Sequence, residues 1–293
     1  MSNKNINSRI SLALCQMKVV KNKISNIEKA VSMLETAASR GAEIAVLPEM
    51  FNCPYDISYF REYSEIDPIK LTAPENHNAN SVTICAISEA ARRLSITVVA
   101  GSIPENDNNR IYNTCFVFDS EGRIIAKHRK IHLFDIDMPE KITFKESAVL
   151  SPGNTLGLFD TDFCKAGVMI CYDMRFPELM RQYALAGAEV VFVPAAFNMV
   201  TGPAHWKLTI RARALDNQIY VAAVSPSRDI STSYIAYGHS MLAGPCGDTV
   251  ATLKEDEGIL FSEINMEKIK EIRNQLPLLK HRREDVYNKH IIV

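Results

Sequence analysis

Short runs of apolar and β-branched residues alternate with amphipathic segments along most of this chain, and this alternation constrains its fold more than any other feature. Buried strands are expected where four to eight such residues follow one another, at 10–17, 44–47, 97–100, 166–171, 190–194 and 219–224. Helical periodicity lies between these runs, at 25–40, 81–94, 177–187 and 205–217. Strands that alternate with helices build sheets whose faces the helices cover, so the sequence predicts a layered α/β architecture.

Turn and cap signals mark the ends of several elements. Ser25 and Glu28 have the spacing of a capping box at the start of the first helix, and Gly41 is expected to end that helix. Pro177 suits the first position of a later helix. Antiparallel hairpins are expected at 113–129 and across 245–247, so the sheets are predicted to be mixed.

No Gly- or Ser-rich linker divides the chain, which indicates a single domain over residues 10–265. Residues 1–9 are polar and are expected to form a flexible N-terminus. Residues 266–293 begin as a helix and then become basic around 280–283. A charged segment of this length is typical of a solvated arm or an oligomer contact rather than a nucleic-acid site.

The composition excludes several classes of protein. Hydrophobic residues make up 47% of the chain, which is enough for a large core. The net charge is −1, so no basic surface for nucleic acid or an anionic membrane is indicated. The apolar stretch at 190–197 is too short to span a bilayer, and the polar start lacks the apolar segment of a signal peptide. We expect a cytoplasmic protein whose partner is a small molecule.

The seven cysteines have no Cys-x-x-Cys spacing. An odd number argues against a disulfide framework, and the spacing argues against a zinc site built from paired thiolates. They lie at positions 15, 53, 85, 115, 164, 171 and 246.

Three polar residues follow predicted strands, where ligands of open α/β sheets bind. Glu49 follows 44–47, Lys130 follows the second strand of the first hairpin, and Cys171 ends 166–171. Taken singly, they are typical of a turn carboxylate, a surface lysine and a small core residue. Taken together, they supply a base, a fixed cation and a nucleophile.

This set of side chains predicts acyl transfer to water. Lys130 and the helix that begins near Pro177 are expected to lower the pKa of the Cys171 thiol and favour the thiolate. Glu49 can accept the thiol proton, donate it to a leaving amine and later activate water. Lys130 and the backbone N–H of Tyr172 are expected to stabilise the oxyanion.

Other chemistries are weaker interpretations. His128 and His132 have the four-residue spacing of a helical zinc site, but their segment is predicted to be a strand and Arg129–Lys130 lies between them, so no metal is expected. The segment around Ser240 lacks the second glycine of a serine nucleophile elbow. Neither a Walker loop nor a dinucleotide-binding glycine motif is present, so no cofactor is expected.

Longer motifs around these residues resemble the nitrilase superfamily of carbon–nitrogen hydrolases, from about residue 10 to 287. The motifs are Ile-Ala-Val-Leu-Pro-Glu49, His-Arg-Lys130-Ile-His-Leu-Phe-Asp and Gly-Val-Met-Ile-Cys171-Tyr-Asp-Met-Arg-Phe-Pro-Glu. Further segments are similar to the omega-amidase branch, including Phe-Asn-Cys-Pro-Tyr55, Lys-Ile-Thr-Phe-Lys-Glu146 and Ala-Phe197-Asn-Met-Val-Thr-Gly-Pro-Ala-His-Trp206.

The resemblance implies a four-layer αββα sandwich that forms a homodimer. It also implies a catalytic triad of Glu49, Lys130 and Cys171, with Glu146 supporting the lysine. Omega-amidases hydrolyse the terminal amide of 2-oxoglutaramate and 2-oxosuccinamate and release ammonia and a 2-oxo dicarboxylic acid. Such a dicarboxylate monoamide carries a carboxylate remote from the amide, and Arg175 is the expected bidentate partner for that group. The remaining residues expected to bind substrate are Tyr55, Tyr172 and Phe197.

Three departures from the family pattern leave the pocket size open. Cys53, Ala195 and Cys246 stand where Ser, Gly and Trp are expected. Alternative functions are a carbamoyl-amino-acid hydrolase, a deaminated-glutathione amidase or a binding protein that kept the fold without catalysis.

Overall fold

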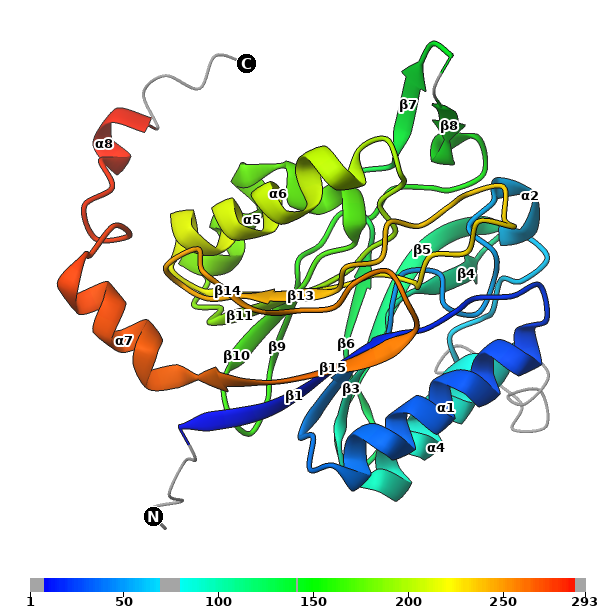
Figure 1. Cartoon of the computed structure of the whole chain (residues 1–293), viewed down its shortest axis with the longest axis horizontal. Coiled ribbons are helices and arrows are strands. Elements are labelled where there is room, and N and C mark those ends of the chain that lie inside the picture. The colour runs from blue at the N-terminus through cyan, green and yellow to red at the C-terminus, as the bar shows by residue number, and fades with distance from the viewer. Residues whose placement is uncertain (1–7, 69–79, 141, 288–293) are drawn as a thin grey trace.

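Two β-sheets packed face to face form the centre of the computed structural model, which describes residues 8–68, 80–140 and 142–287 (Figure 1). The first sheet has seven strands in the order β15-β1-β2-β3-β5-β4, and β6 pairs with β5. Its strands are β1 (Arg9–Gln16), β2 (Ile44–Val46), β3 (Thr97–Val99), β4 (Ile103–Asp107), β5 (Arg110–Phe118), β6 (Ile124–Arg129) and β15 (Gly258–Asn265). The pairs β1–β2 and β2–β3 are parallel and the others are antiparallel.

The second sheet has six strands in the order β14-β13-β12-β11-β10-β9. Its strands are β9 (Gly157–Asp160), β10 (Lys165–Val168), β11 (Val190–Pro194), β12 (Tyr220–Val224), β13 (Met241–Ala243) and β14 (Thr249–Thr252). Strands β10, β11 and β12 are parallel, as the alternation with helices predicts.

Helices cover the outer face of each sheet (Figure 1). Helices α1 (Lys23–Ser39) and α4 (Val82–Leu94) lie on the first sheet, while α5 (Pro177–Leu185) and α6 (Gly202–Asn217) lie on the second. Alternate residues of β1 serve the two interfaces, since Leu12 and Leu14 pack between the sheets and Ala13 and Cys15 pack toward α1 and α4. This arrangement confirms the predicted αββα sandwich.

Most of the predicted elements are present, with one correction at a helix start. Helix α4, the first position of α5 at Pro177 and the hairpins β5–β6 and β13–β14 are confirmed. The predicted capping box at Ser25 is wrong, because α1 begins at Lys23 and its capping residue lies three positions before Ser25. Asn22 caps α1 and accepts a hydrogen bond from the Ser25 N–H at 2.9 Å.

Three smaller elements extend the sandwich. Helix α2 (Ile57–Phe60) follows β2, and the hairpin of β7 (Asp135–Met138) and β8 (Ile142–Lys145) projects from the body (Figure 1). The C-terminal segment contains α7 (Met266–Gln275) and α8 (Glu284–Tyr287) and leads away from the sheets.

The predicted flexible N-terminus falls mostly outside the described residues, which begin at 8, and Arg9 already belongs to β1. Across 8–68, 80–140 and 142–287, every helix is too short or too polar to cross a membrane.

Candidate active site

The backbone brings Glu49, Lys130 and Cys171 to one edge of the sandwich. Glu49 lies three residues beyond β2, and Lys130 directly follows β6. Cys171 lies three residues beyond β10 and opens a short 3-10 helix, Cys171–Arg175. The sequence therefore located the three strand ends, although Cys171 lies on the turn beyond its strand.

Lys130 is held between two carboxylates in the protein interior. Its Nζ lies 2.9 Å from Glu49 Oε1 and 2.9 Å from Glu146 Oε1, and all three side chains are fully buried. Burial alone would lower the pKa of Lys130, but the negative charges of Glu146 and Glu49 outweigh it and raise that pKa well above its usual value. Lys130 is therefore a permanent cation.

Glu146 is fixed from two directions. Its Oε2 accepts a hydrogen bond from the Phe134 N–H at 2.7 Å, and its Oε1 accepts one from the Tyr55 hydroxyl at 2.7 Å. The same carboxylate oxygen contacts Lys130. Glu146 therefore holds the lysine in place, as the resemblance implied.

Glu49 is restrained on one oxygen and open on the other. Its Oε1 accepts hydrogen bonds from Asn113 Nδ2 at 2.8 Å and the Tyr55 hydroxyl at 3.3 Å. Its Oε2 is buried without a hydrogen-bond partner in the described chain, and the carboxylate lies beside the Cys171 thiol. Burial raises the pKa of Glu49, and the Lys130 charge offsets this rise only in part.

Cys171 corrects one prediction made from the sequence. Burial and the negative charge of Glu49 raise the pKa of its thiol well above the usual value, and Lys130 and the Ala196 N–H oppose this rise only in part. The predicted lowering of the Cys171 pKa is therefore wrong. The resting group is a thiol, because its partner cation is already neutralised by two carboxylates.

Close backbone packing supports the Glu49 loop. Gly101 has a φ of +48°, and a Cβ at this position would lie 2.1 Å from the Pro48 carbonyl oxygen. Only glycine allows this approach. Cys171 itself has a φ of +47°, a left-handed conformation that is uncommon for a residue with a side chain. Both sides of the site therefore depend on unusual backbone geometry.

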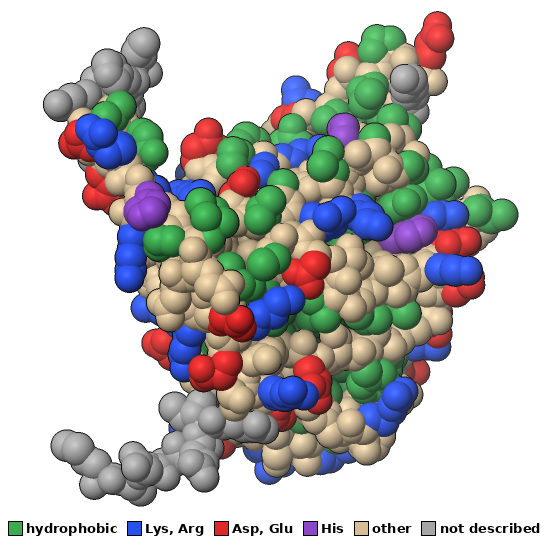
Figure 2. Space-filling model, turned by 60° about the vertical axis from the view of Figure 1, so that its left-hand side comes forward, with side chains coloured by type: hydrophobic (Ala, Val, Ile, Leu, Met, Phe, Trp, Pro, Cys, Tyr) green, Lys and Arg blue, Asp and Glu red, His purple; other side chains and the backbone are tan. Residues whose placement is uncertain are grey.

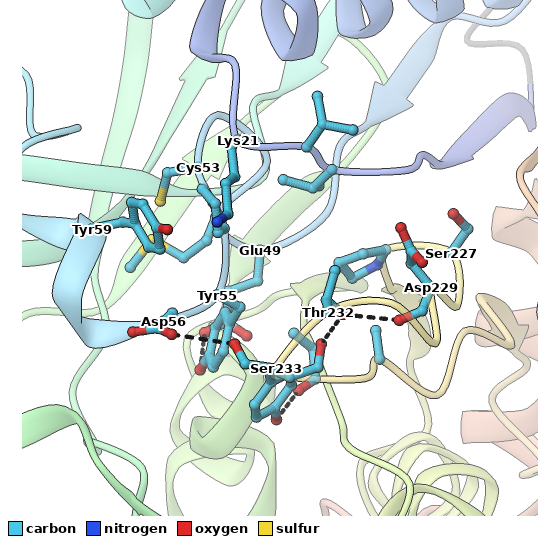
Figure 3. Close-up of a pocket in the computed structure, with 18 of the residues that line it drawn as sticks. Lys21, Glu49, Cys53, Tyr55, Asp56, Tyr59, Ser227, Asp229, Thr232 and Ser233 are labelled. Atoms are coloured by element: carbon cyan, nitrogen blue, oxygen red, sulfur yellow. Dashed lines mark hydrogen bonds between the residues drawn. The ribbon is translucent and has the colours of Figure 1, made fainter.

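A cavity of about 490 Å³ reaches the constellation at Glu49, while Lys130, Glu146 and Cys171 are not among the residues that line it (Figure 3). Glu49, Tyr55 and Ala196 line it together with residues from three loops. Two of these loops are joined across the cavity, where Ser233 Oγ lies 3.2 Å from Asp56 Oδ2. The cavity is large enough for a small organic substrate.

Aromatic rings form one wall of the site. Tyr55 stacks on Phe144 of β8, with ring centroids 5.5 Å apart and planes 18° apart. Tyr234 also packs on Tyr55, with a centroid distance of 4.6 Å. The β7–β8 hairpin thus contacts the residue that bonds Glu146 and Glu49.

Comparison with known proteins places the chain in a family. The model of the carbon-nitrogen hydrolase family matches residues 11–274. The chain belongs to the carbon-nitrogen hydrolases. This result confirms the family resemblance and the class of enzyme, a hydrolase of carbon–nitrogen bonds.

Several relatives of this carbon-nitrogen hydrolase align over nearly the whole chain. Omega-amidase NIT2 of Mus musculus is 48% identical over 280 residues, covering 96% of this chain and 97% of that protein. Omega-amidase NIT2 of Homo sapiens is 47% identical over 276 residues, covering 94% and 96% respectively.

Solved structures agree with these sequence matches. Saccharomyces cerevisiae Nit3, a member of branch 10 of the nitrilase superfamily, has 41% identity and a TM-score of 0.85, covering 97% of this chain and 100% of that one. The Caenorhabditis elegans NitFhit protein has 31% identity and a TM-score of 0.84, covering 95% of this chain and 66% of that one.

The residues predicted to bind substrate in this carbon-nitrogen hydrolase do not all lie on the wall of the cavity. The Tyr55 hydroxyl is already engaged by Glu146 and Glu49. Arg175 does not line the described cavity. Its guanidinium lies over the Phe197 ring at 4.5 Å and the Tyr172 ring at 5.7 Å.

The hydrogen bonds of the Arg175 guanidinium leave some of its N–H groups without a partner in the described chain. Its Nη1 lies 3.0 Å from His205 Nδ1, while its Nε is buried without a partner in the described chain. The guanidinium therefore has donor capacity left for a ligand.

Two residues near the cavity were missed in the sequence. Lys21 is the single cation among the described residues that line the cavity, and its side chain points between Tyr59 and Glu49 (Figure 3). Asn113 bonds Glu49 through its side chain and accepts the Lys130 N–H at 2.8 Å through its carbonyl oxygen. Asn113 begins the first predicted hairpin, but no local pattern indicated its contact with Glu49.

The three residues that depart from the family pattern differ in burial and in their distance from the cavity wall. Cys53 is buried and lines the cavity, Ala195 is buried, and Cys246 is exposed in the β13–β14 turn. Only Cys53 therefore changes the wall of the described cavity.

The two histidines with the four-residue spacing contact one buried carboxylate. His128 and His132 both turn to the buried carboxylate of Asp173. Within the part of the chain that the structure describes, no group of three or more His, Cys, Asp or Glu side chains is arranged to hold a metal ion.

Proposed function

We propose that this carbon-nitrogen hydrolase is an omega-amidase that acts on 2-oxoglutaramate and 2-oxosuccinamate. The observation that carries the proposal is the buried Lys130 ammonium, held at 2.9 Å by both Glu49 and Glu146 beside the Cys171 thiol. Relatives named omega-amidases, 48% and 47% identical over nearly the whole chain, support the choice of substrate.

The acylation half of the reaction uses the open oxygen of Glu49. Cys171 Sγ attacks the amide carbonyl carbon while Glu49 accepts the thiol proton. Lys130 Nζ and the Tyr172 N–H stabilise the negative oxygen of the tetrahedral intermediate. Glu49 then gives its proton to the amide nitrogen, the C–N bond breaks, ammonia leaves and a thioester remains on Cys171.

The deacylation half returns the enzyme to its starting state. Glu49 removes a proton from a water molecule, whose oxygen attacks the thioester carbon. The C–S bond of the second tetrahedral intermediate breaks, and Glu49 returns the proton to the Cys171 sulfur.

A substrate panel tests the proposal directly. We expect ammonia release from 2-oxoglutaramate and 2-oxosuccinamate to exceed release from glutamine and carbamoyl-β-alanine by at least about 100-fold in kcat/KM. Glutamine carries an ammonium in place of the 2-oxo group and carbamoyl-β-alanine lacks that oxygen, so site groups that bond the 2-oxo group are left unpaired. Cys171→Ala should abolish release without unfolding the protein. Preference for carbamoyl-β-alanine would instead support a carbamoyl-amino-acid hydrolase, and retained turnover in Cys171→Ala would exclude Cys171 as the nucleophile.

The remote carboxylate provides a second prediction. We expect Arg175→Lys to reduce kcat/KM for 2-oxoglutaramate about tenfold more than for butyramide, because a point charge replaces a bidentate fork. Lys21→Met is the matched comparison, since Lys21 lines the cavity. If only Lys21→Met reduces kcat/KM selectively for 2-oxoglutaramate, Lys21 and not Arg175 binds the remote carboxylate. If each variant reduces kcat/KM equally for both substrates, neither residue binds it.

The assembly and location remain predictions. We propose a homodimer with a contact in the C-terminal segment that begins at Met266, because this segment leads away from the sandwich (Figure 1). A monomer in sedimentation velocity experiments on the full chain would contradict it. The cytoplasmic location rests on the sequence alone.

A further inference from the structure

One buried carboxylate outside the catalytic constellation connects its two halves. Asp173 is fully buried two residues beyond Cys171. Its Oδ1 accepts the His132 N–H at 2.8 Å and lies 2.9 Å from His132 Nδ1. Its Oδ2 accepts the Ile170 N–H at 3.1 Å and lies 3.1 Å from His128 Nε2. Asp173 thus contacts residues before and after Lys130 and the residue that precedes Cys171.

The contacts on the lysine side bracket Lys130. His128 lies two residues before Lys130 on β6, and His132 lies two residues after it. His132 contacts Asp173 through both its main chain and its ring, which also stacks on Phe176 with centroids 3.7 Å apart. The segment that carries Lys130 is thus bound to Asp173 at both ends.

The contacts on the thiol side close the turn around Cys171. The Ile170 N–H donates to the Asp173 carboxylate, and the Asp173 N–H donates back to the Ile170 carbonyl oxygen at 3.0 Å. Cys171 lies inside this reciprocal pair with its φ of +47°. A strained residue persists only where its surroundings hold it.

We infer that Asp173, held by His128 and His132, is a positioning residue that fixes the Cys171 thiol relative to Lys130 and Glu49. The inference rests on the proposed function and adds to it the group that aligns the nucleophile. The hydrogen bonds of the Asp173 carboxylate go to the segments that carry Lys130 and Cys171, so it acts through these two residues.

The protonation states of this cluster follow from its contacts. Burial alone would raise the pKa of Asp173, but hydrogen bonds from His128 and His132 hold that pKa well below its usual range. An ionised carboxylate only accepts hydrogen bonds, so His128 presents Nε2–H and His132 presents Nδ1–H. The buried His128 Nδ1 has no partner in the described chain, in agreement with this tautomer.

These tautomers allow a test with near-isosteric variants. The amide of asparagine can replace an imidazole Nδ1–H and that of glutamine an Nε2–H. We expect His132→Asn and His128→Gln to retain kcat within about threefold. His132→Gln and His128→Asn should lose about tenfold in kcat with KM unchanged, since the donor is then misplaced. Asp173→Asn should lose about 100-fold, the loss expected for a displacement of about 1 Å.

A second readout separates positioning from folding and from substrate identity. Iodoacetamide alkylation of Cys171, followed by peptide mass spectrometry, should slow in parallel with kcat, while the exposed Cys246 reacts at the wild-type rate as an internal reference. Thermal unfolding midpoints of the half-exposed His132 variants should stay close to wild type. The inference is overturned if Asp173→Asn keeps wild-type kcat, if asparagine and glutamine are equivalent at both histidines, or if alkylation is unchanged. Failure of the proposed substrate alone would leave the alkylation result intact.

Discussion

At the scale of a single residue, Lys130 shows how a buried charge in this site is stabilised. An ammonium removed from water costs several kcal/mol unless it is paired and hydrogen-bonded. Glu49 and Glu146 supply that pairing at 2.9 Å each, and the two acids and one cation leave one net negative charge beside Cys171. The thiol therefore stays protonated until Glu49 removes its proton during attack.

The raised pKa of Glu49 determines the acid side of the pH–rate profile. Glu49 accepts a proton only when it is ionised, and burial raises its pKa above the usual 4.5. We therefore expect kcat/KM for 2-oxoglutaramate to fall tenfold per pH unit below a midpoint that lies above 4.5. An acid limb at or below the usual glutamate value, measured in a stopped ammonia assay, would contradict this role. The Cys171 pKa, raised above 9.0, places any alkaline limb above that of an ordinary thiol.

At the scale of elements, the strand ends were predictable and their environment was not. Alternating apolar runs located β2, β6 and β10, and thus Glu49, Lys130 and Cys171. The pKa of Cys171 is raised by burial and by the charge of Glu49, which is distant in the chain. The sequence considered only Lys130 and the helix after Cys171, and therefore predicted a lowered pKa. The contact of Asn113 with Glu49 joins residues 64 positions apart, and such pairings leave no local pattern.

The β7–β8 hairpin supports the site from outside the sandwich. Phe144 on β8 stacks on Tyr55, whose hydroxyl bonds Glu146. We expect Phe144→Ala to lower kcat/KM about tenfold, as an aromatic pair contributes roughly 0.5–1.5 kcal/mol beyond its buried area. The control is Thr143→Ala, on an exposed neighbour of the same strand that bonds Asp137 at 2.7 Å. Equal effects of the two variants in steady-state kinetics would mean that the hairpin acts through its own folding and not through Tyr55.

At the scale of the whole molecule, a few paired charges are buried, while charged side chains of both signs are mixed on the surface. The net charge is −1, and acidic and basic side chains are interspersed on the face shown in Figure 2. The sequence did not predict the cavity, because the segments 19–21, 49–59 and 226–236 that line it meet only in the folded chain.

Trapping of an acyl-enzyme would identify the nucleophile of this enzyme. Wild-type protein is mixed with excess 2-oxoglutaramate, quenched in acid during turnover and analysed by intact and peptide mass spectrometry. The proposed mechanism predicts one added 2-oxoglutaryl group on the peptide that contains Cys171, and none in Cys171→Ala. An adduct on any other residue, or rapid turnover with no adduct on Cys171 at quench times shorter than one turnover, would contradict it.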